Sequence, residues 1–407
     1  MGHSERLNND VQKPRYVKQS ISVACVFLAF LIFVILGFLP VAPEPLVKSL
    51  KPVFLVICVL NYRNSYRFGY EKWFVLLHVY LLIIWLANLE TNSSISDYVS
   101  MLLFLLFFLF AGLRMWNSRE IRFIVRSIFY ACLLYSALVL GSNGGLIHAG
   151  GSQHISFLSH TLNRNSSAFA VTPGVICSAF LLFYDRQSPF ERFIYGIGFV
   201  ICFYTVIGLS CRSAFLSASS GTFLVVWQAT KKSGNSGQQF LLRLLFVFVV
   251  VCVLGIGMRA LEGTDSARIF DYSDTGRDDL WEAAWDLIHA KPIFGGGFTY
   301  WSDSGQVMSP HNTFLNIMMI SGYVGGAILG LAVLSMMMEC LRAGNIIALA
   351  FSMEMLFHSI SEAGLDYFAY IPLILTSILL RCSEYQSKDL SKIFAPYPNY
   401  VRGRTRY

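Results

Sequence analysis

Residues 20–39 read SISVACVFLAFLIFVILGFL, an apolar run without a charged side chain that is long enough to cross a bilayer as one α-helix. Similar runs of about 17–22 residues recur along the chain. The chain has 407 residues, of which 55% are hydrophobic and 14% are charged. Soluble domains carry roughly 25% charged residues, so this chain could not cover a water-exposed surface of its own. The runs are continuously apolar rather than alternating, which excludes a transmembrane β-barrel. The composition predicts an all-α, polytopic membrane protein.

About twelve spans fit the chain at the usual helix length. The polar and basic tail before residue 20 lacks the small-residue cleavage site of a removed signal peptide, so we expect residues 20–39 to remain as the first span. We therefore expect one membrane-embedded domain over residues 1–407, with a long outer loop at residues 259–312 between spans nine and ten. The span centres are expected near Leu28, Leu55, Leu81, Leu106, Leu133, Ile176, Phe203, Leu216, Val250, Val324, Met353 and Leu375.

Lys and Arg residues indicate the orientation of these spans. Most of the 31 gather in the two terminal tails and in alternate loops, which the positive-inside rule assigns to the cytoplasm. Both termini are thus expected in the cytoplasm, as an even number of spans requires. The cations that fall on the outer side are Lys48, Lys51, Arg164, Arg212, Arg259, Arg268, Arg277 and Lys291. They suggest an anionic ligand at the outer interface, although snorkelling or salt bridges with nearby aspartates would also explain them.

The cysteines and the loop histidines do not indicate a metal site. Most of the nine cysteines lie inside apolar runs and none forms a C-x-x-C pair, so we interpret them as small packing residues. His148, His154 and His160 follow one another at a six-residue spacing without a cysteine or carboxylate partner, which does not fit a zinc site. We predict no metal and no cofactor. The net charge of +7 is explained by the cytoplasmic loops, so nucleic acid is not an expected partner.

The most polar and Gly-rich part of the chain lies between two late spans. Residues 275–301 read TGRDDLWEAAWDLIHAKPIFGGGFTYW, and residues 302–326 continue as SDSGQVMSPHNTFLNIMMISGYVGG. The first part predicts an amphipathic helix that stops before Pro292 and opens into three glycines. Crossing a membrane does not require a segment of this kind, so it is better interpreted as a site than as a linker.

Two arginines begin apolar runs on the outer side. Residues 207–214 read IGLSCRSA between two spans with almost no loop, so Arg212 must lie in or at the edge of the membrane. A charge there is costly unless it is paired, and it usually has a function. The planar guanidinium can contact two phosphate oxygens at once, with Ser213 or Ser210 beside it. Arg164, followed by Asn165, occupies the corresponding place at the start of an earlier span.

The long outer stretch adds a third arginine and a histidine. Arg277 precedes the amphipathic segment and offers a second phosphate contact, whereas Asp278 and Asp279 would either neutralise it or hold it in place. His311 follows Pro310 and is expected to cap the next span. Imidazole is the usual group for proton transfer near neutral pH. A lone histidine is more often structural, so this interpretation depends on the neighbouring arginines.

A late span carries ionisable residues on one helix face. Glu354, His358 and Glu362 are spaced by four residues, so they share a face from mid-membrane to the outer edge. Ionisable residues within a membrane are functional candidates by default. A buried polar seam that joins helices explains the pattern equally well.

The order of these motifs resembles the O-antigen ligase and polysaccharide polymerase superfamily. The motifs are Ser-Cys-Arg-Ser at 210–213, Gly-Arg-x-x-Leu-Trp at 276–281, Pro-x-x-Gly-x-Gly at 292–297 and Pro-His-Asn-x-x-Leu at 310–315. Each is weak alone, but their order, spacing and membrane side are fairly specific over roughly residues 160–330. Cys211 stands where a serine is common in the family, and we expect the chemistry to be unaffected.

The resemblance implies a metal-independent glycosyltransferase at the outer face of the bacterial inner membrane, with its active site facing the periplasm. The donor would be a glycan on undecaprenyl diphosphate, and the acceptor a hydroxyl of another lipid-linked repeat unit or of the lipid A core. The family's two outer arginines and its histidine correspond to Arg212, Arg277 and His311. The expected substrate-binding residues are Arg164, Asn165, Ser213, Asp278, Trp281, Asn312 and Glu362.

Three functions remain open at this point. The Gly-Arg-x-x-Leu-Trp form favours a polymerase of O-antigen, capsule or exopolysaccharide repeat units, with a chain-length regulator as a possible partner. A ligase that joins the polymer to the lipid A core would use the same residues. A polysaccharide transporter or flippase would show internal repeats or paired broken helices. No convincing repeat is present, and only Glu354 and His358 favour transport.

Overall fold

Apolar runs form α-helices throughout the part of the chain that the computed structural model describes, which is residues 69–87, 95–143, 154–157, 160–184, 188–231, 277–304, 310–361 and 367–381. Three of the twelve expected span centres, Leu28, Leu55 and Val250, lie outside these residues. Each of the others lies within a helix. The helical membrane architecture is therefore confirmed, whereas the number of twelve spans stays a prediction.

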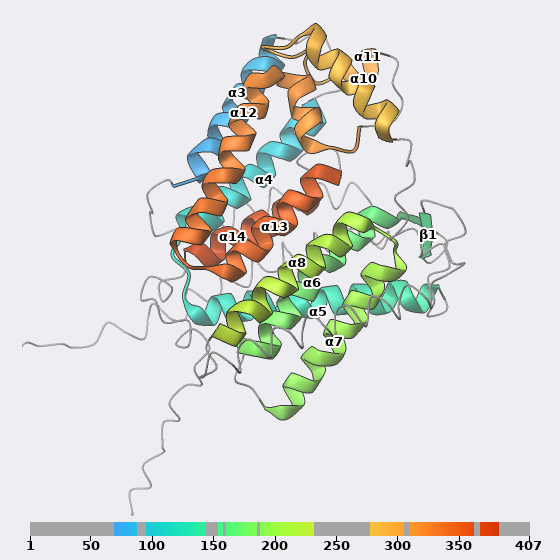
Figure 1. Ribbon diagram of the computed structural model, residues 1–407, viewed down its shortest axis with the longest axis vertical. Helices are drawn as coiled ribbons and strands as arrows, with labels where there is room; N and C mark the ends of the chain where they lie inside the picture. Colours follow the sequence, from blue (N-terminus) through green and yellow to red (C-terminus); the bar gives the residue numbers. More distant parts are fainter. Residues whose placement is uncertain are drawn as a thin grey trace, which may run out of the picture.

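The described helices pack side by side in one bundle (Figure 1). Four of them, α5, α6, α7 and α12, are long and apolar enough to cross a membrane, and α13 and α14 are shorter apolar helices. In chain order the helices are α3 (Glu71–Ala87), α4 (Ile95–Leu113), α5 (Ser118–Ser142), α6 (Arg164–Tyr184), α7 (Pro189–Gly208), α8 (Arg212–Lys231), α10 (Arg277–Ala290), α11 (Tyr300–Asp303), α12 (Thr313–Arg342), α13 (Ile346–Ser361) and α14 (Tyr367–Leu380).

Capping residues fix where α5 and α7 begin. Asn117 and Glu120 form a capping box at the start of α5, in which each side chain accepts a hydrogen bond from the other residue's backbone N–H. Ser188 and Glu191 form the same arrangement before α7, with Pro189 at its first position. These contacts satisfy N–H groups that have no partner within the helix, so each helix starts at a defined residue.

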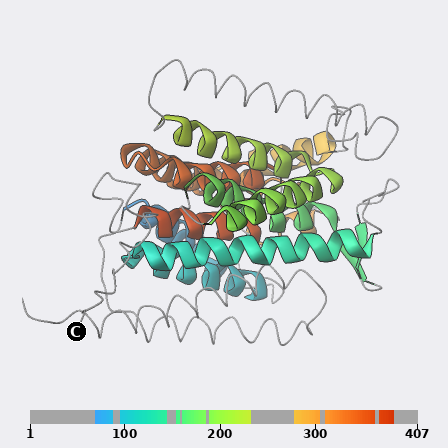
Figure 2. The same ribbon diagram turned by 90° about the horizontal axis from the view of Figure 1, so that it is seen from below.

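The packed helices define two ends of the bundle (Figures 1 and 2). Ser217 of α8 donates to the backbone oxygen of Glu354 in α13 over 3.3 Å, and Gly221 lies opposite Ala350, so α8 and α13 are antiparallel. A short turn then reverses the chain between α12 and α13. The starts of α6, α8 and α12 therefore lie together with the end of α13, and we call this the Arg212 end.

The opposite end, which we call the Arg381 end, carries basic side chains. Lys72 lies at the start of α3, Arg192 near the start of α7 and Arg342 at the end of α12. Arg381 follows α14 directly. This segregation agrees with the alternation of loops expected from the sequence, because Arg164 and Arg212 lie at the other end.

A buried cluster of charges joins four helices at the Arg381 end. The guanidinium of Arg381 pairs with Glu71 at 2.7 Å and with Glu339 at 2.7 Å, and its Nε donates to the carbonyl of Gly112 over 2.9 Å. Arg381 is 3% exposed and Glu71 is completely buried. The start of α3 and the ends of α4, α12 and α14 are thereby tied together.

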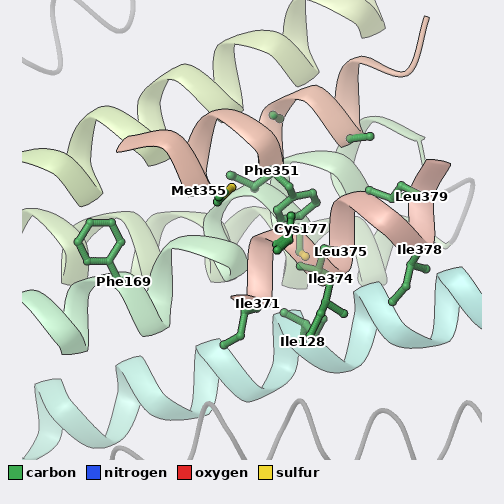
Figure 3. Packing of buried hydrophobic residues seen from close by; sticks show 14 of the residues in the cluster. Ile128, Phe169, Cys177, Phe351, Met355, Ile371, Ile374, Leu375, Ile378 and Leu379 are labelled. Carbon is green, nitrogen blue, oxygen red and sulfur yellow. The ribbon is translucent and has the colours of Figure 1, made fainter. Parts of the chain in front are cut away.

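The apolar core lies between α5, α6, α13 and α14 (Figure 3). Ile128 of α5, Cys177 of α6, Phe351 of α13 and Ile374 of α14 are fully or almost fully buried there. Cysteines take part as free thiols, since Cys132, Cys177, Cys202, Cys211 and Cys340 are all buried without a disulfide. Their interpretation as small packing residues is confirmed for these five.

One feature departs from the all-α prediction. The segment expected as a plain outer loop before α6 contains a two-stranded antiparallel hairpin, β1 (His154–Phe157) and β2 (His160–Asn163). His154 pairs with Asn163 and His160 pairs with Phe157, so the two histidines lie at opposite ends of the ladder. The hairpin leads directly into Arg164.

Candidate functional site

Arg212 is placed by a tight turn between α7 and α8. Three residues separate these helices, and the N–H of Leu209 donates to the carbonyl of Thr205 over 2.9 Å to end α7. Ser210 follows with φ 52, in the left-handed region that non-glycine residues rarely occupy. Cys211 is buried, and Arg212 is half-buried as the first residue of α8. The predicted turn with almost no loop is confirmed.

Arg164 lies beside this turn. It is the first residue of α6 and 6% exposed, and its Nε donates to the carbonyl of Leu209 over 3.2 Å. Asn165 follows and is half-buried, and the Ser213 hydroxyl lies 3.5 Å from the Cys211 thiol. The fold thus brings together four predicted site residues, Arg164, Asn165, Arg212 and Ser213, which come from two separate segments.

A second group forms where α10 packs on α12. Ala284 and Ile288 of α10 form a buried cluster with Leu315 and Met319 of α12. The indole N–H of Trp281 donates to the carbonyl of Pro310 over 2.8 Å. Helix α10 is thereby attached to the residue that precedes His311.

Arg277 lies on the packed face of α10. Positions 277, 281, 284 and 288 follow the spacing of one helix face. Arg277 and Trp281 are half-buried and the other two are buried, whereas Asp278 is exposed and lies off this face. Arg277 therefore lies one turn before Trp281, on the same face of α10 as the side chain that contacts Pro310.

His311 occupies a strained backbone position between two fixed neighbours. Its φ is 48, and it is half-buried. The residue that caps α12 is Asn312, whose side-chain oxygen accepts from the N–H of Phe314 at 2.9 Å and of Leu315 at 3.1 Å. The expectation that His311 caps this span is therefore wrong. Ser210 and His311 are the two non-glycine residues of the described ranges with positive φ, and such strain concentrates at functional sites.

Glycines lock the loop after α10 onto α12. At Gly322, φ 67 and ψ −170 interrupt α12, and Figure 1 shows the change of direction. The loop supplies the missing backbone contacts, since Gly296 donates to Met319 at 2.8 Å, Gly297 to Ile320 at 3.0 Å, and Tyr323 to Pro292 at 2.7 Å. A Cβ at Gly322 would collide with the carbonyl of Ile293. The Pro-x-x-Gly-x-Gly motif thus fixes α10 relative to the start of α12.

Gly322→Ala should destabilise the protein by about 2 kcal/mol or more, because it combines a left-handed φ with a backbone collision. Gly330→Ala is the matched control on the same helix, since a Cβ there meets nothing within 4 Å and alanine favours helix. Thermal unfolding of both variants in detergent measures the difference. Equal melting temperatures would contradict the locking contact.

The two groups lie at the same end of the bundle. The first contains Arg164, Asn165, Arg212 and Ser213, and the second contains Arg277, Trp281, His311 and Asn312. Helix α13 lies between them, since it packs against both α8 and α12 and ends at this level. Glu362, the remaining predicted contact, lies outside the described residues.

Glu354 and His358 are buried below this end. Each is 1% exposed, and the His358 ring lies 4.1 Å from the ring of Phe169 in α6. They face the helix interface rather than the surface that carries the arginines. Their position fits the buried polar seam that was one of the two interpretations of the sequence.

Two of the site arginines lie at helix N-termini, as their positions at the starts of apolar runs predicted. Arg164 and Arg212 are each the first residue of a helix, α6 and α8. A cation at a helix N-terminus opposes the helix dipole and costs roughly 0.3–1 kcal/mol. The same arrangement adds the positive helix end to the guanidinium and favours an anion in front of it.

Comparison with known proteins finds one family that matches part of this chain. The model of the O-antigen ligase family matches residues 197–330, a segment that includes Arg212, Arg277, Trp281, His311 and Asn312. No curated protein matches the chain significantly. Arg164 and Asn165 lie before the matched segment and are placed beside it by the fold. The resemblance predicted from the sequence is confirmed over residues 197–330, where the match supports a relationship to the O-antigen ligase superfamily.

Proposed function

We propose that the protein is a membrane glycosyltransferase that polymerises lipid-linked repeat units of O-antigen, capsule or exopolysaccharide. It takes a glycan from undecaprenyl diphosphate and passes it to a sugar hydroxyl of the acceptor. The reaction takes place at the periplasmic face of the bacterial inner membrane, and both termini lie in the cytoplasm. The observation that carries the proposal is the pair of adjacent arginines, Arg164 and Arg212, at two helix starts on one end of an apolar bundle.

The donor's chemistry fits this arrangement. A lipid diphosphate has its charge at the membrane interface, where its apolar tail still lies among acyl chains. Arg212 is half-buried at the start of α8, and Arg164 is buried beside it. Guanidinium groups contact phosphate oxygens in pairs. The first group therefore binds the diphosphate, with Ser213 and Asn165 as further polar contacts.

The transfer follows from the two groups together. The acceptor oxygen forms a bond to the anomeric carbon, the bond from that carbon to the diphosphate oxygen breaks, and its electron pair leaves with the diphosphate. Arg212 and Arg277 stabilise the charge that develops on the leaving group. Fixed charges of this kind stabilise the leaving group without rearrangement during the reaction. The arginines thereby take the part that a metal ion would otherwise have.

His311 accepts the proton that the acceptor hydroxyl loses. Its backbone is held between Pro310, which Trp281 contacts, and Asn312, which caps α12. A base must be held within hydrogen-bond reach of the hydroxyl, and both neighbours restrict the imidazole's position. Trp281 offers an aromatic surface for a sugar ring beside it. Asp278, on the exposed face of α10, and Glu362 are further proposed substrate contacts.

The polysaccharides of a strain that lacks the protein test this function. A polymerase is supported if single repeat units remain on the carrier or on the lipid A core and the ladder of longer chains disappears. The alternative, a ligase, predicts long polymer on undecaprenyl diphosphate and a bare lipid A core. Loss of the lipid-linked unit from the periplasmic leaflet would indicate a transporter. An unchanged profile would contradict all three.

A further inference from the structure

The loop that follows α10 exposes two large apolar side chains in succession. Ile293 is 57% exposed and Phe294 is 64% exposed, although both belong to a loop on the polar, outer part of the chain. Loop tips in water usually carry polar or small side chains. Two adjacent apolar residues of this size therefore indicate a surface that faces something other than water.

A row of exposed side chains along one side of α12, which we call the stripe, indicates where the membrane ends. After the break at Gly322, exposed residues recur every three or four positions, as expected for a helix side that faces lipid. The stripe spans about 26 Å at a rise of about 1.5 Å per residue, close to the hydrocarbon thickness of about 30 Å. It consists of Val324, Ala327, Leu331, Leu334, Met338 and Leu341. Residues 313–322 of the same helix are all buried or half-buried. The hydrocarbon boundary at the Arg212 end thus lies near Tyr323.

The loop is held at that level. The N–H of Tyr323 donates to the carbonyl of Pro292 over 2.7 Å, and Gly322 packs directly against the backbone of Ile293. Ile293 and Phe294 therefore lie beside the first exposed residues of the stripe and extend the apolar surface that the span presents to lipid.

Aromatic and basic side chains surround the same level. Trp85 stacks on Tyr98 with ring centroids 5.8 Å apart, and Tyr98 meets the edge of Phe298 at 6.1 Å. Lys291 lies 4.7 Å from the ring centroid of Tyr300. Tyrosine and tryptophan concentrate at the headgroup level of membranes, and lysine there contacts lipid phosphates.

We propose that residues 291–294 are inserted into the lipid leaflet at the Arg212 end. Ile293 and Phe294 contact the upper parts of the acyl chains, and Lys291 contacts the headgroup phosphates. The partner is the bilayer surface itself, because the apolar pair is continuous with the lipid-facing side of α12. The locked loop in turn sets the height of α10 above the bilayer.

Bimane fluorescence in proteoliposomes tests this insertion. Phe294→Cys carries the probe at the tip, and Asp286→Cys is the matched control on the exposed side of α10. The wild-type chain, labelled in parallel, corrects for native cysteines. Phospholipid with a nitroxide near the top of the acyl chain should quench the probe at position 294 and leave position 286 largely unaffected, whereas iodide should do the reverse. Iodide quenching at position 294 equal to that at position 286 would overturn the proposal.

Photo-crosslinking gives an independent reading. A benzoylphenylalanine at position 294 should form adducts whose mass corresponds to phospholipid when the proteoliposomes are illuminated. Adducts with another polypeptide or with added glycan acceptor, in place of phospholipid, would show that the apolar tip is a binding surface for that molecule and would overturn insertion into the membrane.

Discussion

Arg212→Ala should abolish glycan transfer while the protein still inserts into the membrane. One fixed donor that stabilises developing charge contributes about 3–4 kcal/mol, so the rate should fall by roughly a hundredfold to a thousandfold. Arg212 is half-buried at the start of α8, beside the buried Arg164, so no mobile side chain at the surface can replace it easily. The measurement is transfer from a lipid-diphosphate donor in proteoliposomes.

Two variants control for charge and for folding. Arg212→Lys keeps the charge but loses the fork that meets two oxygens, so it should retain only part of the activity. Arg192→Ala removes an exposed arginine near the start of α7, at the Arg381 end, and should behave as the wild type. A wild-type rate in Arg212→Ala would remove the diphosphate contact from the mechanism.

His311→Ala is the comparison that separates the two proposed roles. If His311 accepts a proton, added imidazole should restore part of its activity, because a free base can take over that step. Imidazole should not restore Arg212→Ala, whose defect is lost charge at the leaving group. Restoration of both variants, or of neither, would argue against this division of roles.

Arg381→Met should lower stability by about 3–5 kcal/mol, because it leaves a carboxylate buried without its cation. The Glu71 side chain is completely buried, and Arg381 supplies its 2.7 Å partner. Burial alone would lower the pKa of the Arg381 guanidinium, but the charges of Glu71 and Glu339 outweigh it and raise that pKa well above its usual value. The heat resistance of the folded monomer in detergent, read by size-exclusion chromatography, measures the effect.

Arg342→Met is the matched control, since Arg342 is exposed at the same end. The double variant Arg381→Met with Glu71→Gln should recover part of the loss, because the orphaned charge is then removed as well. Equal melting temperatures for the single and the double variant would show that the ion pair between Arg381 and Glu71 does not stabilise the packing of these helices.

The helices and the position of Arg212 could be predicted from the sequence. Continuous apolar runs of this length predict membrane helices, because a helix satisfies its own backbone hydrogen bonds in lipid. Since only three residues separate α7 from α8, Arg212 must lie at a helix end. The capping residue was also readable, because asparagine before an apolar run is a preferred N-cap. The sequence interpretation assigned the cap to His311, one residue before the actual N-cap.

The rest of the site depends on contacts that no local pattern encodes. Trp281 and Pro310 lie 29 residues apart and meet only because α10 packs on α12. A glycine within an apolar run such as Gly322 does not by itself predict an interruption of the helix. The kink at Gly322 is held by a contact with a distant loop, in which the N–H of Tyr323 donates to the carbonyl of Pro292. The β1–β2 hairpin was missed because its strands are four residues long and Leu158-Ser159 between them is not a typical hairpin turn.

The Arg381 cluster also bears on how the chain is made. Arg381 and Glu71 are 310 residues apart, so ribosome-bound chains carry Glu71 long before its partner has been synthesised. Membrane helices emerge in chain order, and α14 is the last of those described. Until it inserts, the Arg381 end of the bundle holds the Glu71 side chain without the arginine that pairs with it. Interrupted synthesis would leave that charge in place, a defect that membrane proteases could use to distinguish incomplete chains from finished ones.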